Sequence, residues 1–439
     1  MINRTNAGQA ADRVVLGQLH DSFQAALHAA DPRSTLASLL PEVPAGRVLV
    51  VGAGKAAASM ACAVEQHWRG KVALEGLVIT RYAHGLSTDF IRVVEAGHPV
   101  PDEAGEAAAR EILERAATLA PEDLLLVLLS GGGSSLMSLP APGLTMPDLK
   151  VLNRVLLASG APITDMNVVR KHVSAIAGGR LAAATAARVL ALIVSDVSGD
   201  DLSAVASGPC IGDGSTYADA LAVIARHAMA VPPAILEHLQ RGARGEIAET
   251  PKPGNALFER VDNRLIGDAH SALEAGVACL RDHGYAVANL GDTVSGEARE
   301  VAQVYAALVR EIRSFGQPWK APVALVSGGE CTVTLRDPDA GGARGGRCTE
   351  FLLALALALR GVAGVYALAC DTDGIDGSEN NAGAVLTPES LQRAADRGVY
   401  AQACLDRHDA WGFFEASEGL VVTGPTRTNV NDYRVILIT

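Results

Sequence analysis

Two apolar segments of the sequence run into the same tripeptide, Ser-Gly-Gly. Residues 124–129 lead into Ser130-Gly131-Gly132-Gly133-Ser134-Ser135, and residues 323–326 lead into Ser327-Gly328-Gly329-Glu330. Glycines allow backbone N–H groups to converge on an oxyanion, and serine hydroxyls add further donors. A helix that begins at Ser135 would contribute its positive end. One such segment alone is often a tight turn. Two of them, in different halves of the chain, predict loops that bind the phosphates of a nucleotide.

A lysine follows a third glycine turn, Gly52-Ala53-Gly54-Lys55, which comes after an apolar strand. The turn is not a P-loop, because Leu49 and Ala56 stand where that motif needs glycine and a hydroxyl. It does fit a permitted variant of the dinucleotide fingerprint, and Arg81 at the end of the next strand is compatible with NADP. A lysine at the carboxyl end of a parallel strand faces the usual ligand crevice, so Lys55 is a candidate catalytic residue.

Two more apolar runs end in carboxylate clusters. The run 189–194 is followed by Asp196, Asp200 and Asp201, and the run 365–369 is followed by Asp371-Thr372-Asp373-Gly374-Ile375-Asp376. Magnesium takes one or two carboxylates together with phosphate oxygens. Helix capping explains Asp200 and Asp201 better, and an Asp-Gly turn network is the alternative for the second cluster. An EF-hand is excluded because Ile375 occupies a ligand position. The candidate metal ligands are Asp196, Asp373 and Asp376.

Basic side chains gather in two places. A glycine-rich loop carries Arg344 and Arg347, and Arg347 is the stronger candidate for binding phosphate because an apolar helix, residues 351–359, follows it. A second patch contains Arg170, Lys171 and Arg180 and would suit a substrate carboxylate. Among the histidines, His98 lies in a rigid loop, Gly97-His98-Pro99-Val100-Pro101-Asp102. The candidate substrate contacts are therefore His98, Arg170 and Lys171.

The composition narrows the class of protein. A net charge of −12 argues against nucleic acid or an anionic membrane as the main partner, because both would be repelled over most of the surface. The seven scattered cysteines include no CxxC pair, which is typical of reduced thiols in the cytosol. The N-terminus lacks the apolar block of a signal peptide, and no apolar stretch reaches transmembrane length. We expect a cytoplasmic enzyme with a small-molecule substrate, as a monomer or homodimer.

The alternation of strand-like and helix-like apolar patterns along the chain predicts two α/β domains. After an amphipathic helix at about residues 8–30, strands alternate with helices, which implies mostly parallel sheets flanked by helices. A proline-rich, low-apolar stretch ends at Gly254, and the same alternation begins again beyond it. The length of 439 residues also exceeds what one core normally holds. The predicted domains are residues 1–250, Rossmann-like, and 251–439.

Taken together, the motifs resemble those of the bacterial glycerate 2-kinase family, some of whose members are called hydroxypyruvate reductases. The resemblance spans nearly the whole chain and rests on the glycine turns, the His98 loop, both aspartate clusters and Thr423-Gly424-Pro425-Thr426-Arg427-Thr428-Asn429-Val430. It implies transfer of a phosphoryl group from ATP, with Mg²⁺, to the 2-hydroxyl of D-glycerate in a cleft between two α/β domains. Lys55 and Arg347 match the basic active-site positions of the family.

Two positions depart from the family pattern. Ala177 stands in Ser174-Ala175-Ile176-Ala177-Gly178-Gly179-Arg180, where the family usually has lysine, and Cys348 follows Arg347, where it usually has asparagine. The first change removes a positive charge, and the second removes an amide donor and acceptor. If both residues line the active site, substrate choice or turnover changes.

The residues thus support three hypotheses. In the first, a kinase, the two Ser-Gly-Gly loops hold the ATP phosphates, the aspartates hold Mg²⁺, and Lys55 and Arg347 neutralise the transferring phosphoryl group. Asp196 is also the candidate for taking the proton of the acceptor hydroxyl. The second is an NAD(P)H-dependent hydroxypyruvate reductase, which rests on the Gly52–Gly54 turn and Arg81 but leaves the aspartate clusters unexplained. The third is a regulator that binds a nucleotide or sugar phosphate without turnover.

Overall fold

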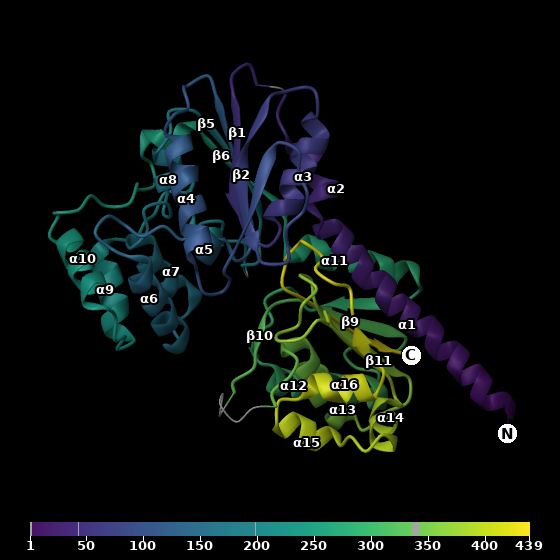
Figure 1. Cartoon of the computed structure of the whole chain (residues 1–439). Helices are drawn as coiled ribbons and strands as arrows, with labels where there is room; N and C mark the ends of the chain where they lie inside the picture. The colour runs from purple at the N-terminus through teal and green to yellow at the C-terminus, as the bar shows by residue number, and fades with distance from the viewer. Residues whose placement is uncertain (1, 43, 198, 336–341) are drawn as a thin grey trace. The chain divides into compact units, whose positions relative to one another are not determined.

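The computed structural model describes residues 2–42, 44–197, 199–335 and 342–439, and its chain divides into two units (Figure 1). Unit 1 contains both ends of the chain, Met1–Asp31 and Asp268–Thr439. Unit 2 is the continuous segment Pro32–Gly267. This division differs from the expected domains 1–250 and 251–439. The boundary moves to residue 267 because Val261–Gly267 forms a strand at the edge of the sheet of unit 2.

Unit 2 is built on a six-stranded sheet in which every neighbouring pair is parallel. Its order is β3-β2-β1-β4-β5-β6. The strands are β1 (Val48–Ala53), β2 (Leu74–Arg81), β3 (Ile91–Ala96), β4 (Leu124–Leu129), β5 (Arg188–Val194) and β6 (Val261–Gly267). Every residue of β1 and β4 is buried, as expected for central parallel strands covered on both faces. The strand order reverses between β1 and β4, and ligands of such sheets bind at the carboxyl ends of the strands beside this switch point.

The helices of unit 2 cover the sheet and also form a second, smaller core. They are α2 (Pro32–Thr35), α3 (Ala57–Trp68), α4 (Glu103–Ala116), α5 (Gly133–Leu136), α6 (Met146–Ala158), α7 (Ile163–His172), α8 (Arg180–Ala183), α9 (Tyr217–Arg226) and α10 (Pro233–Ala243), with 3₁₀ turns at Leu36–Leu39, Val205–Ser207 and Ala256–Arg260. Helices α6, α7, α9 and α10 pack around Leu152, Val169, Tyr217 and Leu239. These four helices lie together beside the sheet (Figure 1).

Unit 1 contains a six-stranded sheet of order β13-β12-β11-β14-β9-β7. The strands are β7 (Ala286–Asn289), β9 (Val323–Ser327), β11 (Val365–Asp371), β12 (Gly383–Leu386), β13 (Leu420–Val421) and β14 (Asp432–Ile438), and a separate pair is formed by β8 (Gly296–Glu297) and β10 (Cys331–Thr332). Strand β14 is antiparallel to both β9 and β11, whereas β7 and β9 are parallel. The predicted α/β class is confirmed for both units, but the sheet of unit 1 is mixed and only that of unit 2 is entirely parallel.

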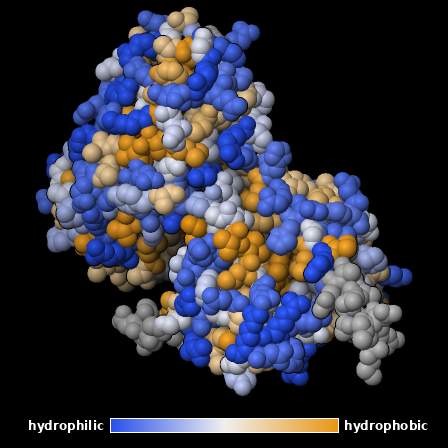
Figure 2. Space-filling view, turned by 45° about the vertical axis from the view of Figure 1, so that its right-hand side comes forward, coloured by the Kyte–Doolittle hydropathy of each residue, from blue (hydrophilic) through white to orange (hydrophobic). Residues whose placement is uncertain are grey.

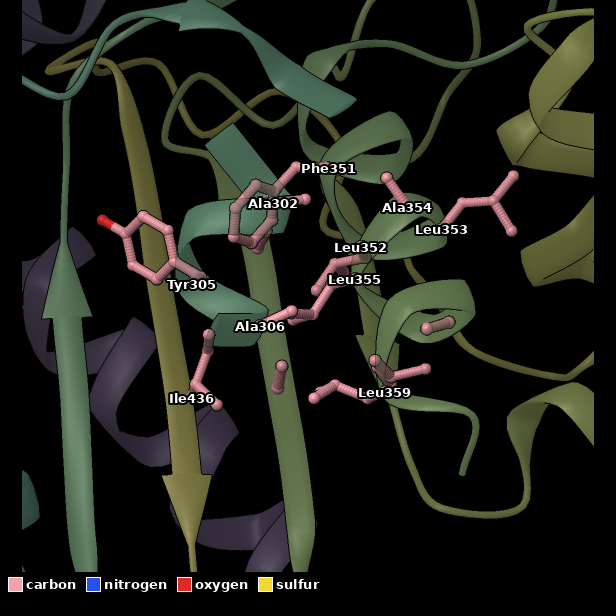
Figure 3. Close-up of a cluster of buried hydrophobic side chains, with 14 of the residues drawn as sticks. Ala302, Tyr305, Ala306, Phe351, Leu352, Leu353, Ala354, Leu355, Leu359 and Ile436 are labelled. Carbon is pink, nitrogen blue, oxygen red and sulfur yellow. The ribbon is translucent and has the colours of Figure 1, made fainter. Parts of the chain in front are cut away.

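The helices of unit 1 are α1 (Ile2–Ala30), α11 (Ala269–Asp282), α12 (Ala298–Phe315), α13 (Arg347–Leu359), α14 (Ser390–Asp396), α15 (Ala401–Asp406) and α16 (Ala410–Ala416). Figure 3 shows the apolar contacts of α12 and α13 against the sheet, with Tyr305 edge-on to Phe351 at a ring separation of 5.4 Å. On another side of the unit α1 packs against α11, and Phe23 of α1 lies 5.9 Å from the ring of Tyr433. The predicted N-terminal helix is therefore part of unit 1.

The surface is mixed in polarity. On the face shown in Figure 2, apolar patches are separated by hydrophilic residues. Within the described residues, no helix is both long enough and apolar enough to cross a membrane. The seven cysteines are all described, and none of them forms a disulfide in the structure.

Candidate active site

The turn after β1 and the loop after β4 are bound to each other. The Lys55 N–H donates to the Gly131 carbonyl at 2.9 Å, and the Ser130 N–H donates to the Ala53 carbonyl at 3.1 Å. The Ser130 hydroxyl, which is buried, accepts a hydrogen bond from the Ala56 N–H at 2.9 Å. The half-buried Lys55 is thereby fixed at the carboxyl ends of the two central strands, where the sequence predicts it.

Gly54 is required for this contact. It has φ +141°, and a Cβ built on it would lie only 2.0 Å from the Ser130 Oγ. In the dinucleotide fingerprint the corresponding glycine leaves room for a pyrophosphate. Here the side chain of Ser130 occupies that room, so the turn is adapted to the loop after β4. This geometry counts against the reductase hypothesis.

The rest of the loop after β4 contacts His98 and a serine that the sequence analysis missed. Gly132 has φ +82°, and a Cβ on it would lie 2.8 Å from His98 Nε2, which places the imidazole against the loop. The Ser134 and Ser207 hydroxyls are 2.9 Å apart. Ser135 donates to the Gly132 carbonyl at 3.1 Å. The predicted helix begins at Gly133 rather than Ser135 and is only four residues long, so it adds little dipole to the loop.

Ser207 belongs to a strained turn. Ala206 and Ser207 have φ of +50° and +58°, values that residues with a Cβ seldom adopt. The Cβ of Ala206 packs against Gly133, where an added Cβ would lie 2.6 Å away. The Ser207 hydroxyl also donates to Asn167 Oδ1 at 3.3 Å. Such strain is concentrated at functional sites. The only sequence signal was the Ser207-Gly208-Pro209 turn, which resembles many others.

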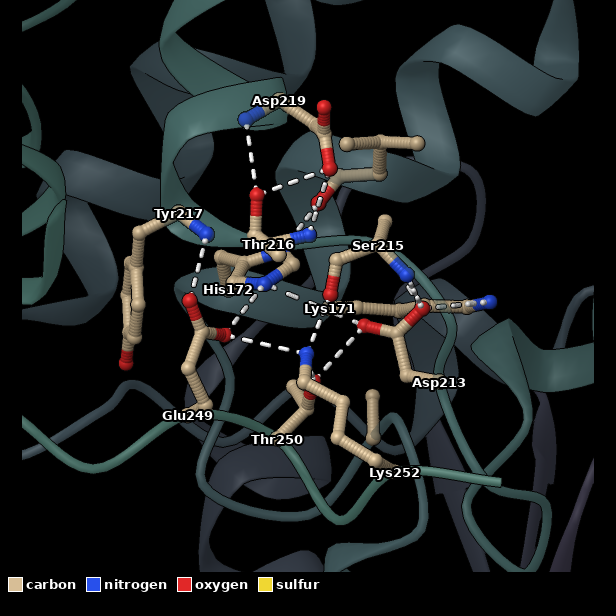
Figure 4. Close-up of polar contacts among 12 residues, drawn as sticks. Lys171, His172, Asp213, Ser215, Thr216, Tyr217, Asp219, Glu249, Thr250 and Lys252 are labelled. Atoms are coloured by element: carbon tan, nitrogen blue, oxygen red, sulfur yellow. Dashed lines mark hydrogen bonds and ion pairs between the residues drawn. The ribbon is translucent and has the colours of Figure 1, made fainter. Parts of the chain in front are cut away.

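The predicted pair Arg170 and Lys171 is not brought together. Successive helical residues point about 100° apart. Lys171 is 8% exposed, and its Nζ lies 3.5 Å from Asp213 Oδ1 in a network with His172, Thr250 and Ser215 (Figure 4). Arg170 instead points toward Asn153 on α6. The environment of Lys171 is that of a structural ion pair.

Unit 1 carries a separate charged cluster around Arg347, which begins α13. Its Nη2 lies 2.7 Å from Asp371 Oδ2, its Nε 2.7 Å from Asp432 Oδ1, and its Nη1 3.0 Å from Glu330 Oε1. Burial by itself lowers the pKa of Arg347, but the carboxylates of Asp432, Asp371 and Glu330 outweigh it and hold the pKa well above its ordinary value. Arg347 is therefore a fixed cation.

The sheet explains how these groups meet. Asp371 ends β11 and Asp432 begins the antiparallel β14, so the two residues are register partners. Asp432 and Arg434, which the sequence analysis missed, are both buried and paired at 2.6 Å. The sequence did contain a signal that could have revealed them, because two charged residues lie two positions apart in an otherwise apolar strand.

The second Ser-Gly-Gly loop differs from the first. Arg434 donates to the carbonyls of Gly328 and Gly329 at 2.8 and 3.3 Å, and the Gly328 N–H donates to the Gly291 carbonyl at 2.9 Å. The backbone therefore directs acceptors at an arginine, and it leads into β10 rather than a helix. The prediction that Gly328, Gly329 and Glu330 bind nucleotide gains no support from these contacts, and the side chain of Glu330 pairs with Arg347.

The predicted metal ligands have different environments. Asp376 is fully buried and accepts hydrogen bonds from Cys348 N–H, Thr349 N–H and the Thr349 hydroxyl, so both its oxygens cap α13. Asp373 accepts from Ile375 N–H, and Asp196 is half-buried after β5. No group of three or more metal-type side chains gathers within the described ranges. Because both oxygens of Asp376 are used in this way, Asp376 does not fit a magnesium ligand, and Asp196 in unit 2 and Asp373 in unit 1 each stay a prediction.

The two departures from the family pattern have different surroundings. Ala177 lines a pocket in unit 2 that also contains Arg170 and Ser134. Cys348 is fully buried in α13, and burial raises the pKa of its thiol well above the ordinary value. Only Ala177 is placed to contact a ligand through its side chain.

Comparison with known proteins identifies the family. A family model described as "Domain of unknown function (DUF4147)" matches residues 18–240, and one described as "MOFRL family" matches residues 323–432. A protein of Agrobacterium vitis that carries hydroxypyruvate reductase as a provisional name is 49% identical over 95% of this chain and 93% of its own length. The glycerate 2-kinase of Pyrococcus horikoshii is 36% identical over 90% of this chain and 88% of its own.

A solved structure agrees with these matches. The crystal structure of glycerate kinase from Thermotoga maritima superimposes with a TM-score of 0.84 at 34% identity, covering 98% of this chain and 100% of that one. The α/β architecture is shared over the whole length. The chain therefore belongs to the glycerate 2-kinase family, as its motifs indicate.

Proposed function

We propose that this protein catalyses the transfer of the γ-phosphoryl group of ATP to the 2-hydroxyl of D-glycerate. The observation that carries the proposal is the backbone position of Lys55 at the carboxyl ends of β1 and β4. Its N–H donates to the Gly131 carbonyl, and Ser130 holds the neighbouring residues Ala53 and Ala56. Family membership supports it, because relatives and a structural neighbour are named glycerate kinases. The filled space at Gly54 disfavours the dinucleotide alternative.

The roles follow from charge. The loop Ser130–Ser135 offers backbone donors to the ATP phosphates, and Lys55 neutralises charge on the transferring phosphoryl oxygens. Magnesium, when bound, would supply further neutralisation of the phosphates, and Asp196, which follows β5 in unit 2, would be its ligand. Asp196 is also the candidate for accepting the proton of the substrate hydroxyl. His98 and Arg170 are the substrate contacts. Lys171 is not assigned this role, because its side chain forms an ion pair with Asp213.

The test is an assay that recognises the position of phosphorylation. The protein is incubated with ATP, magnesium and D-glycerate, and the product is passed to enolase without a mutase. Enolase accepts 2-phosphoglycerate but not the 3-isomer, so a signal establishes 2-phosphorylation. NADH and hydroxypyruvate are supplied in a parallel reaction. Oxidation of NADH without an enolase signal would replace the kinase with the reductase.

The variants Ala177→Lys and Cys348→Asn distinguish a retuned kinase from a regulator. Each restores the side chain usual in the family. A signal that appears only in these variants would identify a kinase site disabled at that position. Silence of the wild type and of both variants in both assays, together with nucleotide binding, would support a regulator that does not turn over.

A further inference from the structure

Unit 2 contains a small pocket beside the loop after β4. Apolar surface comes from residues such as Leu149, Leu152 and Ile176, and the polar lining consists of Ser134, Ser138, Asn153, Arg170, Ser174 and Ser207. The cavity volume is about 30 Å³. A single water needs roughly 10–15 Å³ measured in this way, so the pocket has room for about two water-sized groups. Two oxygens of one carboxylate match that size.

Arg170 brings a positive charge to this pocket, and none of the described carboxylates pairs with it. Its Nε lies 3.4 Å from Asn153 Oδ1 and its Nη1 lies 3.5 Å from Asn167 Oδ1, both long for hydrogen bonds. In the part of the chain that the structure describes, Arg170 forms no ion pair with a carboxylate, in contrast to Arg347. Burial lowers the pKa of Arg170 accordingly. A desolvated guanidinium with neutral neighbours is suited to receive an anion, and its fork matches a carboxylate.

A chain of polar contacts connects Arg170 to the glycine loop. Arg170 contacts Asn167, Asn167 accepts from Ser207, and the Ser207 hydroxyl lies 2.9 Å from that of Ser134. Ser134 itself belongs to the loop that the proposed function assigns to phosphate. The strained backbone at Ala206 and Ser207 is what holds the hydroxyl of Ser207 in this chain. An anion bound at Arg170 would thus lie close to the loop to which the proposed function assigns the ATP phosphates.

We propose that this pocket binds the carboxylate group of the acceptor acid, with Arg170 as its ionic partner. The inference rests on the proposed function and adds which group of the acceptor the protein recognises. The acceptor must be a small hydroxy acid whose carboxylate enters the pocket, while its hydroxyl remains on the side of Ser134. An uncharged polyol with the same hydroxyls lacks the group that Arg170 receives.

The test is direct binding, measured by titration calorimetry with D-glycerate and, separately, with glycerol and ATP. Arg170→Gln removes the charge and is expected to raise the Kd for D-glycerate at least tenfold, with the Kd for ATP unchanged. Asn153→Asp keeps the arginine but places a carboxylate beside it. It is expected to weaken D-glycerate binding to a similar extent. Arg154→Gln is the matched control, because Arg154 lies on α6 and is exposed.

The outcomes separate this inference from the proposed function. If Arg170→Gln and Asn153→Asp bind D-glycerate as tightly as the wild type, the pocket assignment is wrong even where the enolase assay succeeds. No binding of D-glycerate to the wild type, or equal binding of glycerol, also overturns it. Binding that depends on Arg170 but leads to no phosphorylation would support the pocket and contradict the kinase. A circular dichroism melt of each variant confirms that it has folded.

Discussion

Arg347 donates from its Nε to Asp432 Oδ1 at 2.7 Å, and the side chain of Asp432 is fully buried. Arg347 is thus one of two arginines, with Arg434, that make this buried carboxylate tolerable in the sheet of unit 1. Because the same guanidinium also contacts Asp371, its removal would leave two negative charges close together in a dry environment.

Arg347→Met is therefore expected to lower stability. Removing one partner of a buried ion pair costs about 3–5 kcal/mol. We expect the melting temperature to fall by several degrees. Arg347→Lys retains a charge but not the three directed contacts, so its melting temperature should lie between those of the wild type and Arg347→Met. An unchanged melting temperature in Arg347→Met would show that the carboxylates are neutralised in another way.

Lys55→Ala is expected to lower kcat about 10²-fold or more, because a fixed cation at the transferring phosphoryl group stabilises the transition state. The measurement is steady-state kinetics in the enolase-coupled assay. Lys71→Ala, at an exposed lysine, is the control and should keep the activity of the wild type. A Lys55→Ala enzyme with nearly full kcat would remove this residue from the mechanism.

Gly54 and Gly70 allow the contact with Ser130 to be separated from backbone strain. Both have positive φ, +141° and +71°, but a Cβ on Gly70 meets nothing within 4 Å. Gly70→Ala should cost about 1 kcal/mol from strain alone. Gly54→Ala should cost about 3 kcal/mol or more, because the new Cβ also collides with Ser130. Thermal unfolding of the two variants provides the comparison, and equal losses would refute the steric argument.

The buried Asp213 should make stability depend on acid pH. Burial by itself raises the pKa of Asp213, but Lys171 and the hydrogen bonds from Ser215 outweigh it, and the pKa lies below its ordinary value. A carboxyl whose pKa is lowered on folding stabilises the protein above its unfolded pKa of about 3.9 and loses this contribution as the pH falls through the folded pKa.

Asp213→Asn should accordingly lower the melting temperature most at about pH 6, and its difference from the wild type should shrink below about pH 4. The exposed Glu237→Gln on α10 is the control and should show no such trend. A difference for Asp213→Asn that stays constant across this range would mean that the carboxyl does not titrate as described.

The elements that the sequence predicted best are those whose burial is continuous. The apolar run 124–129 became β4 with the expected bounds, and the run 323–326 became β9, which extends one residue further to Ser327. Strand β6 was missed because Asp262, Asn263 and Arg264 break the apolar pattern at the edge of the sheet. The direction of β14 could not be predicted either, since a short apolar strand carries no information about its neighbours.

The candidate site residues, too, could be predicted only where the local sequence pattern was clear. Lys55 and the loop Ser130–Ser135 could be predicted to follow strands β1 and β4 because glycines at strand ends are visible in the sequence. Arg170 and Lys171 were grouped because they are adjacent, although a helix turns neighbouring side chains apart. Asn167 and Ser207 were missed because their role arises only when α7 and the turn at Val205–Ser207 meet.

The packing of α1 against α11 has a consequence for biosynthesis. Helix α1 precedes unit 2 in the chain, whereas α11 follows it. Leu19, Phe23 and Ala26, which are buried in the finished protein, must therefore remain without their partner surface while the whole of unit 2 leaves the ribosome. Unit 2, being continuous, can fold during that interval. The nascent chain thus presents an apolar helical stripe to molecular chaperones, and a fragment 268–439 expressed alone would lack the helix that covers α11.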